Sequence, residues 1–254
     1  MGTGGVTAVL GGGAMGRAIL AGVVASAGAD AEVRVTTRSR AGAARVAPSP
    51  GVTVWDLEDE PDANRIAVRG AALVVVAVKP LAVGEVLGAV RDDLAPGAVV
   101  VSVAAGVSLA ALARTLPASV AAVRAMPNTP IAIAHGVTGL AGGERVTDAQ
   151  WSLVRAVFES VGMVVTLDES RLDALGTVSG SGPAYLYFVV EQLIRAARTL
   201  GFSPEEASRL VIATFVGAAS LVARTGDAPE ELRRQVTSPG GTTERAIAVL
   251  DDAH

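Results

Sequence analysis

Three glycines near the start of the chain are the first residues whose types and spacing could do chemistry. Gly11, Gly13 and Gly16 form the pattern G-x-G-x-x-G between two apolar runs, which predicts a strand, a tight turn and a helix. Gly11 would permit the turn, Gly13 would leave the backbone open to a pyrophosphate, and Gly16 would let the helix lie close to the strand. The free N–H groups and the dipole at the helix N-terminus favour phosphate. A glycine turn without a ligand is the alternative.

The residues after the second predicted strand indicate which dinucleotide would bind. An NAD-binding fold usually has an acidic residue there, which binds the ribose hydroxyls. This chain instead has Arg38, Ser39 and Arg40, and the first two could bind a 2′-phosphate. We therefore predict NADPH as the cofactor, with NADH possible. The alternative is that Arg38 and Arg40 are solvated residues at the start of the next helix.

Candidate residues also stand at the ends of three later apolar runs. Lys79, the single lysine among 21 basic residues, follows a run that is typical of a central parallel strand. Ligands of doubly wound folds bind at the carboxyl ends of such strands. Ala105 belongs to a small-residue segment that would let a ring approach the backbone. Asn128 lies in a proline-bounded loop, where an ordinary turn is the alternative.

Two segments rich in glycine and hydroxyl groups precede apolar helices in the second half of the chain. They are Ser-Gly-Ser-Gly-Pro-Ala-Tyr at residues 179–185 and Thr-Ser-Pro-Gly-Gly-Thr-Thr at residues 237–243. Hydroxyl groups beside the N–H groups of a helix N-terminus are suited to hold a carboxylate. Either segment could instead be a helix cap with a hinge.

Composition excludes several classes of function. The 254 residues include no cysteine and two histidines, which excludes disulfides, thiolate catalysis and Cys- or His-rich metal sites, so we predict no metal. The net charge of -4 and an aromatic content of 3% argue against nucleic acid as a partner. No apolar run reaches the roughly 20 residues of a membrane span, and no basic segment precedes the first apolar run. We therefore expect a cytoplasmic protein without a membrane partner.

The order of patterns predicts an α/β fold with two domains. Strand and helix patterns alternate through residues 1–167, which predicts a Rossmann-type NAD(P)-binding domain. Only helical patterns follow in residues 168–254. Two of these helices are apolar around much of their circumference, which predicts a homo-oligomer. The predicted strands cover residues 6–10, 32–37, 52–54, 72–78, 98–103, 120–125, 136–140 and 163–167. The predicted helices of the second domain cover residues 169–177, 183–200, 204–225, 229–235 and 243–254.

Six motifs, taken together in this order, resemble the pyrroline-5-carboxylate reductase family. They are GGGAMG at 11–16, AVKP at 77–80, SVAAG at 102–106, MPNTP at 126–130, SGSGPAY at 179–185 and TSPGGTT at 237–243. The last is the most specific, whereas many dehydrogenases share the first. The resemblance implies an N-terminal Rossmann domain, a helical C-terminal domain that forms a homodimer, and an active site near the domain junction. It also implies that the dimers could assemble into a decamer.

The resemblance also assigns site residues. Thr243 would be the catalytic residue, with its hydroxyl near the nitrogen of the substrate. The substrate-binding residues would be Glu169, Ser181, Gly240, Gly241, Thr242 and Thr243. The cofactor-binding residues would be Gly11, Gly13, Ala14, Met15, Gly16, Arg38, Ser39, Asn64, Ala77, Val78, Lys79, Pro80, Ala105 and Asn128.

The implied reaction transfers hydride from NADPH to C5 of L-1-pyrroline-5-carboxylate, a small cyclic imine, and forms L-proline. Positioning of two rings can supply much of the rate, so no strong general acid is needed. We interpret His135 as a loop residue. Two alternatives remain. A β-hydroxyacid dehydrogenase would need a catalytic lysine in the helical domain, and no lysine follows Lys79. A non-catalytic NADP-binding protein would need no carboxylate pocket.

Overall fold

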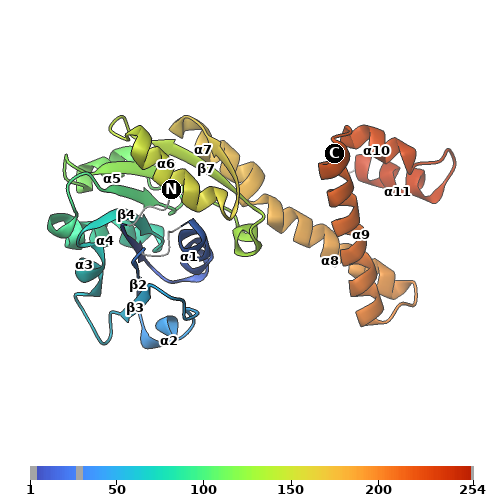
Figure 1. Cartoon of the computed structure of the whole chain (residues 1–254). Helices are drawn as coiled ribbons and strands as arrows, with labels where there is room; N and C mark the ends of the chain where they lie inside the picture. Colours follow the sequence, from blue (N-terminus) through green and yellow to red (C-terminus); the bar gives the residue numbers. More distant parts are fainter. Residues whose placement is uncertain (1–4, 27–30, 253–254) are drawn as a thin grey trace. The chain divides into compact units, whose positions relative to one another are not determined.

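The computed structural model describes residues 5–26 and 31–252 and divides the chain into two compact units. The first unit is Met1–Pro183 and the second is Ala184–His254. The first is a sheet covered by helices, and the second consists of helices (Figure 1). The predicted α/β fold class is confirmed.

An eight-stranded sheet forms the centre of the first unit, in the order β3-β2-β1-β4-β5-β6-β7-β8. Strands β1 to β6 are parallel, β7 is antiparallel to β6, and β8 is parallel to β7. The chain therefore leaves β1 toward one edge and returns to its other side at β4, which is the switch point of a dinucleotide fold. The strands are β1 Val6–Leu10, β2 Val33–Thr37, β3 Val52–Asp56, β4 Ala71–Val76, β5 Val99–Ser102, β6 Ala121–Met126, β7 Gly136–Gly142 and β8 Gly162–Thr166.

Apolar side chains on both faces of the sheet build two separate cores. In β4, Leu73 and Val75 belong to one core, whereas Val74 and Val76 belong to the other. A strand buried on both faces needs a continuous apolar sequence, and this is why the run at residues 72–78 predicts a central strand. One face is covered by α1 Ala14–Ser26 and α6 Asp148–Glu159, and the other by α3 Ala63–Val68, α4 Val83–Val90 and α5 Leu109–Thr115.

Short helices complete the edges of the first unit. They are α2 Arg40–Ala43, α7 Leu172–Leu175, the 3-10 turns η1 Pro80–Ala82, η2 Arg91–Asp93, η3 Thr129–Ile133 and η4 Glu169–Arg171, and the π turn η5 Gly176–Gly180. The segment from η4 to η5 belongs to the first unit because its side chains pack on the sheet. Leu172 is fully buried, and a Cβ on Gly139 of β7 would lie 2.8 Å from it. The compact unit thus extends past the predicted boundary at residue 167.

The segment at residues 179–185 continues from a π turn into α8, where the sequence predicts a break between helices ending at residue 177 and beginning at residue 183. The N–H of Ser181 donates to the carbonyl of Gly176 at 3.0 Å, which closes a π turn before α8 begins at Gly182. The extra residue of a π turn is accommodated in a helix at the cost of one widened turn. The expectation of free N–H groups is therefore wrong for Ser181.

The second unit has little core of its own. Its helices are α8 Gly182–Thr199, which starts at the junction, α9 Pro204–Thr225, α10 Pro229–Gln235 and α11 Thr242–Asp251. Among their described residues only Ala207 and Val211 are buried. The large apolar side chains that remain exposed on α8 and α9 include Tyr185, Leu186, Tyr187, Phe188, Val189, Leu193, Leu210, Ile212, Val216, Leu221 and Val222. An exposed apolar surface of this extent marks a site of interaction with a protein or a membrane.

Helix α9 is also long and apolar enough, by length and composition, to cross a membrane. Its mean hydropathy is 1.4, and 11% of the apolar window is buried. It is the one such helix in the described part of the chain. A capping box at Ser203, in which its hydroxyl accepts the N–H of Glu206 and the Glu206 carboxylate accepts the N–H of Ser203, sets its start as predicted.

Candidate functional site

The glycine turn between β1 and α1 has the geometry that a pyrophosphate requires. A Cβ on Gly16 would lie 1.9 Å from the carbonyl oxygen of Gly11, so only glycine lets α1 approach the strand this closely. Gly11 itself has a φ of 106°. A Cβ on Gly13 would meet no atom within 4 Å from the described residues beyond its immediate neighbours in the chain. The space over Gly13 is therefore open to a ligand, whereas Gly11 and Gly16 serve the turn itself.

The start of α1 presents backbone donors to this open space. No hydrogen bond from the amides of Gly13, Ala14, Met15 or Gly16 reaches another described residue, because these are the first N–H groups of the helix. The carbonyl of Gly12 accepts a bond from Arg17 at 3.0 Å, which ties the helix to the turn. The residues present thus fit a dinucleotide pyrophosphate.

The residues predicted to bind the adenosine part of the cofactor lie at the carboxyl end of β2. The guanidinium of Arg38 is exposed and has no partner among the described residues. The Ser39 hydroxyl accepts the N–H of Gly42 at 3.2 Å and caps α2. The Thr36 hydroxyl donates to the Oδ1 of Asn64 at 2.6 Å, which leaves both Nδ2 hydrogens of Asn64 without an acceptor in the described chain. Thr36 was not among the predicted site residues, although its hydrogen bond orients Asn64, which was predicted to bind the cofactor.

The carboxyl ends of β4 and β5 bring the predicted nicotinamide residues to the same edge of the sheet. The N–H of Ala77 donates to the carbonyl of Leu10 at 2.8 Å, and Val78 lies under the glycine turn. Lys79 and Pro80 are exposed, and Lys79 has no partner among the described residues. Ala105, after β5, is exposed as well.

Asn128 has a different environment from the other predicted cofactor residues. It is 7% exposed, its Oδ1 accepts the N–H of Val137 at 2.8 Å, and its Nδ2 donates to the carbonyl of Ser179 at 2.9 Å. The side chain thus joins the loop after β6 to β7 and to the π turn. This geometry favours a positioning role over direct contact with a cofactor.

A buried arginine was missed in the sequence. Arg124 on β6 has a side chain that is 5% exposed, and it pairs with Glu169 at 3.3 Å and with Asp173 at 2.5 Å. Glu169 also accepts the N–H of Leu109, the first residue of α5, at 2.7 Å. The sequence does contain a signal for this cluster, because Arg124 is a charged residue inside an apolar strand. A buried charge must be paired, so acidic partners could have been expected. Glu169, a predicted substrate residue, is engaged here in holding η4 to the sheet.

The predicted carboxylate site lies at the start of α11 in the second unit. The amides of Thr242, Thr243 and Glu244 reach no acceptor among the described residues, as expected for the first turn of a helix. The N–H of Gly240, whose φ is 71°, donates to the carboxylate of Glu244 at 2.7 Å. The N–H of Gly241 donates to the carbonyl of Ser238 at 2.9 Å, so two of the predicted donors are engaged within the turn. Thr243 is exposed.

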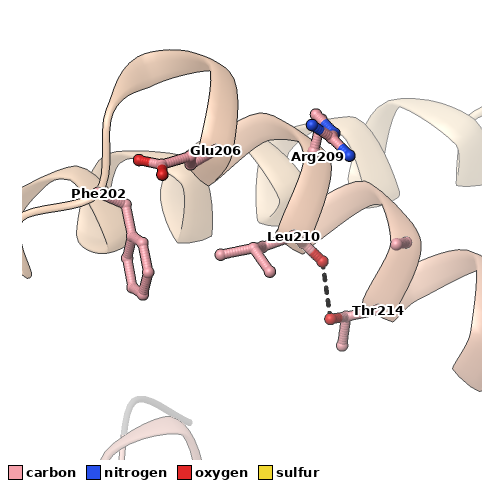
Figure 2. A pocket seen from close by; sticks show the side chains of 6 residues that line it. Phe202, Glu206, Arg209, Leu210 and Thr214 are labelled. Carbon is pink, nitrogen blue, oxygen red and sulfur yellow. Dashed lines mark hydrogen bonds between the residues drawn. The ribbon is translucent and has the colours of Figure 1, made fainter.

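An open groove of about 690 Å³ lies along the start of α9 in the same unit. Figure 2 shows the side chains around it, with Phe202 and Leu210 lying on either side and the Thr214 hydroxyl bonded to the Leu210 carbonyl at 2.8 Å. The lining residues are Phe202, Glu206, Arg209, Leu210, Ala213 and Thr214, and none of them is a predicted site residue. The groove is formed by the first turns of α9 and by Phe202, which precedes the helix.

Each unit therefore gathers one part of the predicted site. The first unit brings predicted cofactor residues from the ends of four strands to one edge of its sheet, and the side chain of Asn128 bonds to Val137 and Ser179. The second unit gathers Gly240, Gly241, Thr242 and Thr243 at one helix start. No group of three or more Asp, Glu or His residues with metal-binding geometry occurs among the described residues.

Two family models match the chain. The model described as NADP oxidoreductase, coenzyme F420-dependent, matches residues 6–106, which contain the glycine turn. The model described as pyrroline-5-carboxylate reductase dimerisation matches residues 169–254. The second match covers the helices whose apolar side chains are exposed.

Relatives of known name match nearly the whole chain. A pyrroline-5-carboxylate reductase of Corynebacterium melassecola is 37% identical over 97% of this chain and 90% of its own length. One of Mycobacterium leprae is 39% identical over 96% of this chain and 88% of its own length. The solved structure of a pyrroline-5-carboxylate reductase from Coxiella burnetii is 34% identical, covers 99% of this chain and 92% of that chain, and superposes with a TM-score of 0.85.

Proposed function

Because the chain belongs to the pyrroline-5-carboxylate reductase family, we propose that it reduces L-1-pyrroline-5-carboxylate to L-proline with NADPH, the final step of proline biosynthesis from glutamate. The observation that carries this proposal is the presence in one chain of two helix starts, at α1 and at α11, whose first amides have no acceptor among the described residues, the first beside an open glycine turn. A dinucleotide and a carboxylated imine are the two ligands that such a pair of sites would serve.

The first unit would bind and orient the cofactor. The amides at the start of α1 would bind the pyrophosphate over Gly13, and Arg38 and Ser39 would bind the 2′-phosphate. Ala105 and the segment from Ala77 to Pro80 would border the nicotinamide. When bound, NADPH supplies the hydride that adds to C5 of the protonated imine, and the electron pair of the C=N bond moves to the ring nitrogen.

The second unit would bind the substrate. The N–H groups of Gly240 and Thr242 would hold its carboxylate, which would replace the carboxylate of Glu244 at Gly240. The N–H of Gly241 would join them on leaving the carbonyl of Ser238, to which it donates at 2.9 Å. The Thr243 hydroxyl, one residue further along, would contact the ring nitrogen and could donate or accept a hydrogen bond there. Positioning of the imine against the nicotinamide would then supply much of the rate.

The exposed apolar side chains of α8 and α9 support the assembly part of the proposal. The chain carries the dimerisation domain of its family, and a second copy would cover these side chains. We propose a homodimer that assembles further into a decamer, in the cytoplasm and without a membrane partner. The apolar character of α9 would then serve packing between subunits.

The test measures the loss of NADPH absorbance with L-1-pyrroline-5-carboxylate and is repeated with NADH. A separate assay measures the gain of NADPH absorbance with a 3-hydroxy acid plus NADP⁺. We expect turnover with the imine and a preference for NADPH. Turnover of the hydroxy acid alone would favour a β-hydroxyacid dehydrogenase. Binding of NADPH without turnover of either substrate would favour a non-catalytic NADP-binding protein, and both results would refute the proposal.

A further inference from the structure

A turn of acidic residues stands beside the predicted 2′-phosphate site. We call Asp56, Glu58 and Asp59 the acidic turn. Asp56 ends β3 and pairs in register with Thr37, the last residue of β2, so the turn follows at the same edge of the sheet as Arg38. Helix α2, which begins at Arg40, packs on β3. Negative charge therefore adjoins the position where the cofactor's phosphate would bind.

Hydrogen bonds hold the acidic turn in one conformation. Asp56 is 8% exposed, and its Oδ1 accepts the N–H groups of Glu58 at 3.2 Å and of Asp59 at 3.0 Å. The two following carboxylates are thereby presented toward α2. This bonding of an aspartate to the backbone two and three residues on is a stable local arrangement.

Both carboxylates bind Arg40. The Arg40 guanidinium donates to both oxygens of Asp59, with an Nε to Oδ2 distance of 3.1 Å. The Arg40 backbone N–H donates to Glu58 at 3.0 Å. The hydrogen bond with Asp59 raises the pKa of Arg40 and lowers the pKa of Asp59. Arg38, two residues earlier, has no such partner, so only one of the two arginines after β2 is free.

We propose that Asp59 and Glu58 limit the selectivity of this protein for NADPH over NADH by holding Arg40 away from the 2′-phosphate. The inference rests on the proposed function, because it concerns the same cofactor site. A 2′-phosphate would meet one free guanidinium, that of Arg38, and a second, that of Arg40, which is already paired with Asp59. A ribose hydroxyl carries no charge and would be affected little.

The expected size of the effect follows from the exposure of the pair. The side chains of Arg40 and Asp59 are 74% and 55% exposed, so solvent screens their interaction. Exposed ion pairs of this kind change an equilibrium constant by about two- to fivefold. Asp59→Asn should therefore strengthen binding of adenosine 2′,5′-bisphosphate by about two- to fivefold and leave binding of 5′-AMP unchanged.

The experiment measures equilibrium binding of these two nucleotides by titration calorimetry, together with the ratio of kcat/KM for NADPH and NADH. Glu58→Gln should act in the same direction. Glu159→Gln is the matched control, because it removes one carboxylate from an exposed arginine pair on α6, on another part of the unit. An equal gain in the control would overturn the proposal, since a change in net charge would then suffice.

A second variant isolates the role of Arg40. In an Arg40→Ala background, Asp59→Asn should no longer change the ratio of the two affinities by this factor. A gain that persists in that background would overturn the restraint of Arg40 as its cause. If the unsubstituted protein binds neither nucleotide nor NADPH, the proposed function itself fails. If it binds them and Asp59→Asn changes nothing, only the present inference fails.

Discussion

Adding a single methyl group at Gly13 or at Gly16 should separate cofactor binding from folding. The two glycines lie three residues apart in the same turn, yet a Cβ would meet different surroundings at each. At Gly13 it would enter open space, with no atom within 4 Å from described residues other than its chain neighbours. At Gly16 it would lie 1.9 Å from the carbonyl oxygen of Gly11. Gly13→Ala should therefore affect only the ligand, whereas Gly16→Ala should affect the protein.

The expected magnitudes follow from these contacts. Gly13→Ala should change the free energy of unfolding by no more than about 0.5 kcal/mol. Its methyl group would occupy space needed by the pyrophosphate, and overpacking of about 1–3 kcal/mol would weaken NADPH binding by about five- to 150-fold. Gly16→Ala requires the turn or the helix to move by about 1 Å, which should lower the free energy of unfolding by about 1–3 kcal/mol.

Urea unfolding and NADPH fluorescence titration would measure the two quantities. Gly88→Ala on α4 is the control, because its Cβ would also meet no atom within 4 Å, but it lies in a helix away from the turn. It should raise stability by about 1 kcal/mol and leave binding unchanged. Normal NADPH binding by Gly13→Ala would refute the assignment of this space to the pyrophosphate.

Four further predictions test other parts of the molecule. Arg124→Met should lower the free energy of unfolding by about 2 kcal/mol in urea, since it leaves two carboxylates without their buried partner. Asp93→Asn should lower stability at neutral pH. Hydrogen bonds from two arginines lower the pKa of Asp93 from its ordinary value of 3.8, so its contribution should be present above that pH and be lost as the pH falls through the lowered pKa. Thr243→Ala should lower turnover and leave NADPH binding intact; an equal fall in cofactor affinity would contradict its role. Leu210→Asp, in the groove of α9, should shift the dimer toward monomer in sedimentation measurements.

The eight strands and the glycine turn could be predicted because their signals are local. An apolar run of five or six residues indicates a strand that is buried on both faces of a sheet. The spacing of Gly11, Gly13 and Gly16 indicates a turn with fixed steric requirements. The capping box at Ser203 is local as well. Each of these features depends on residues a few positions apart, so the sequence contains the whole signal.

The direction of β7 required the tertiary structure. The apolar run at residues 136–140 predicts a strand without saying how it pairs. The connection from β6 to β7 contains only η3, and a parallel pair would need a crossover of a dozen or more residues. The strand therefore turns back and pairs with β6 in the antiparallel direction.

The sequence by itself determined the family, the cofactor fold and the residues that its motifs carry. Only the tertiary structure decided which of these residues are free to bind a ligand. Asn128 bonds to Ser179, Glu169 to Arg124, and Arg40 to Asp59, across separations of 19 to 51 residues. Such pairs form because folding brings distant polar groups to one place; the buried ones, such as Arg124 and Asn128, must find a partner as water is removed. Neither the spacing of residues along the chain nor its composition indicates which polar groups pair in this way.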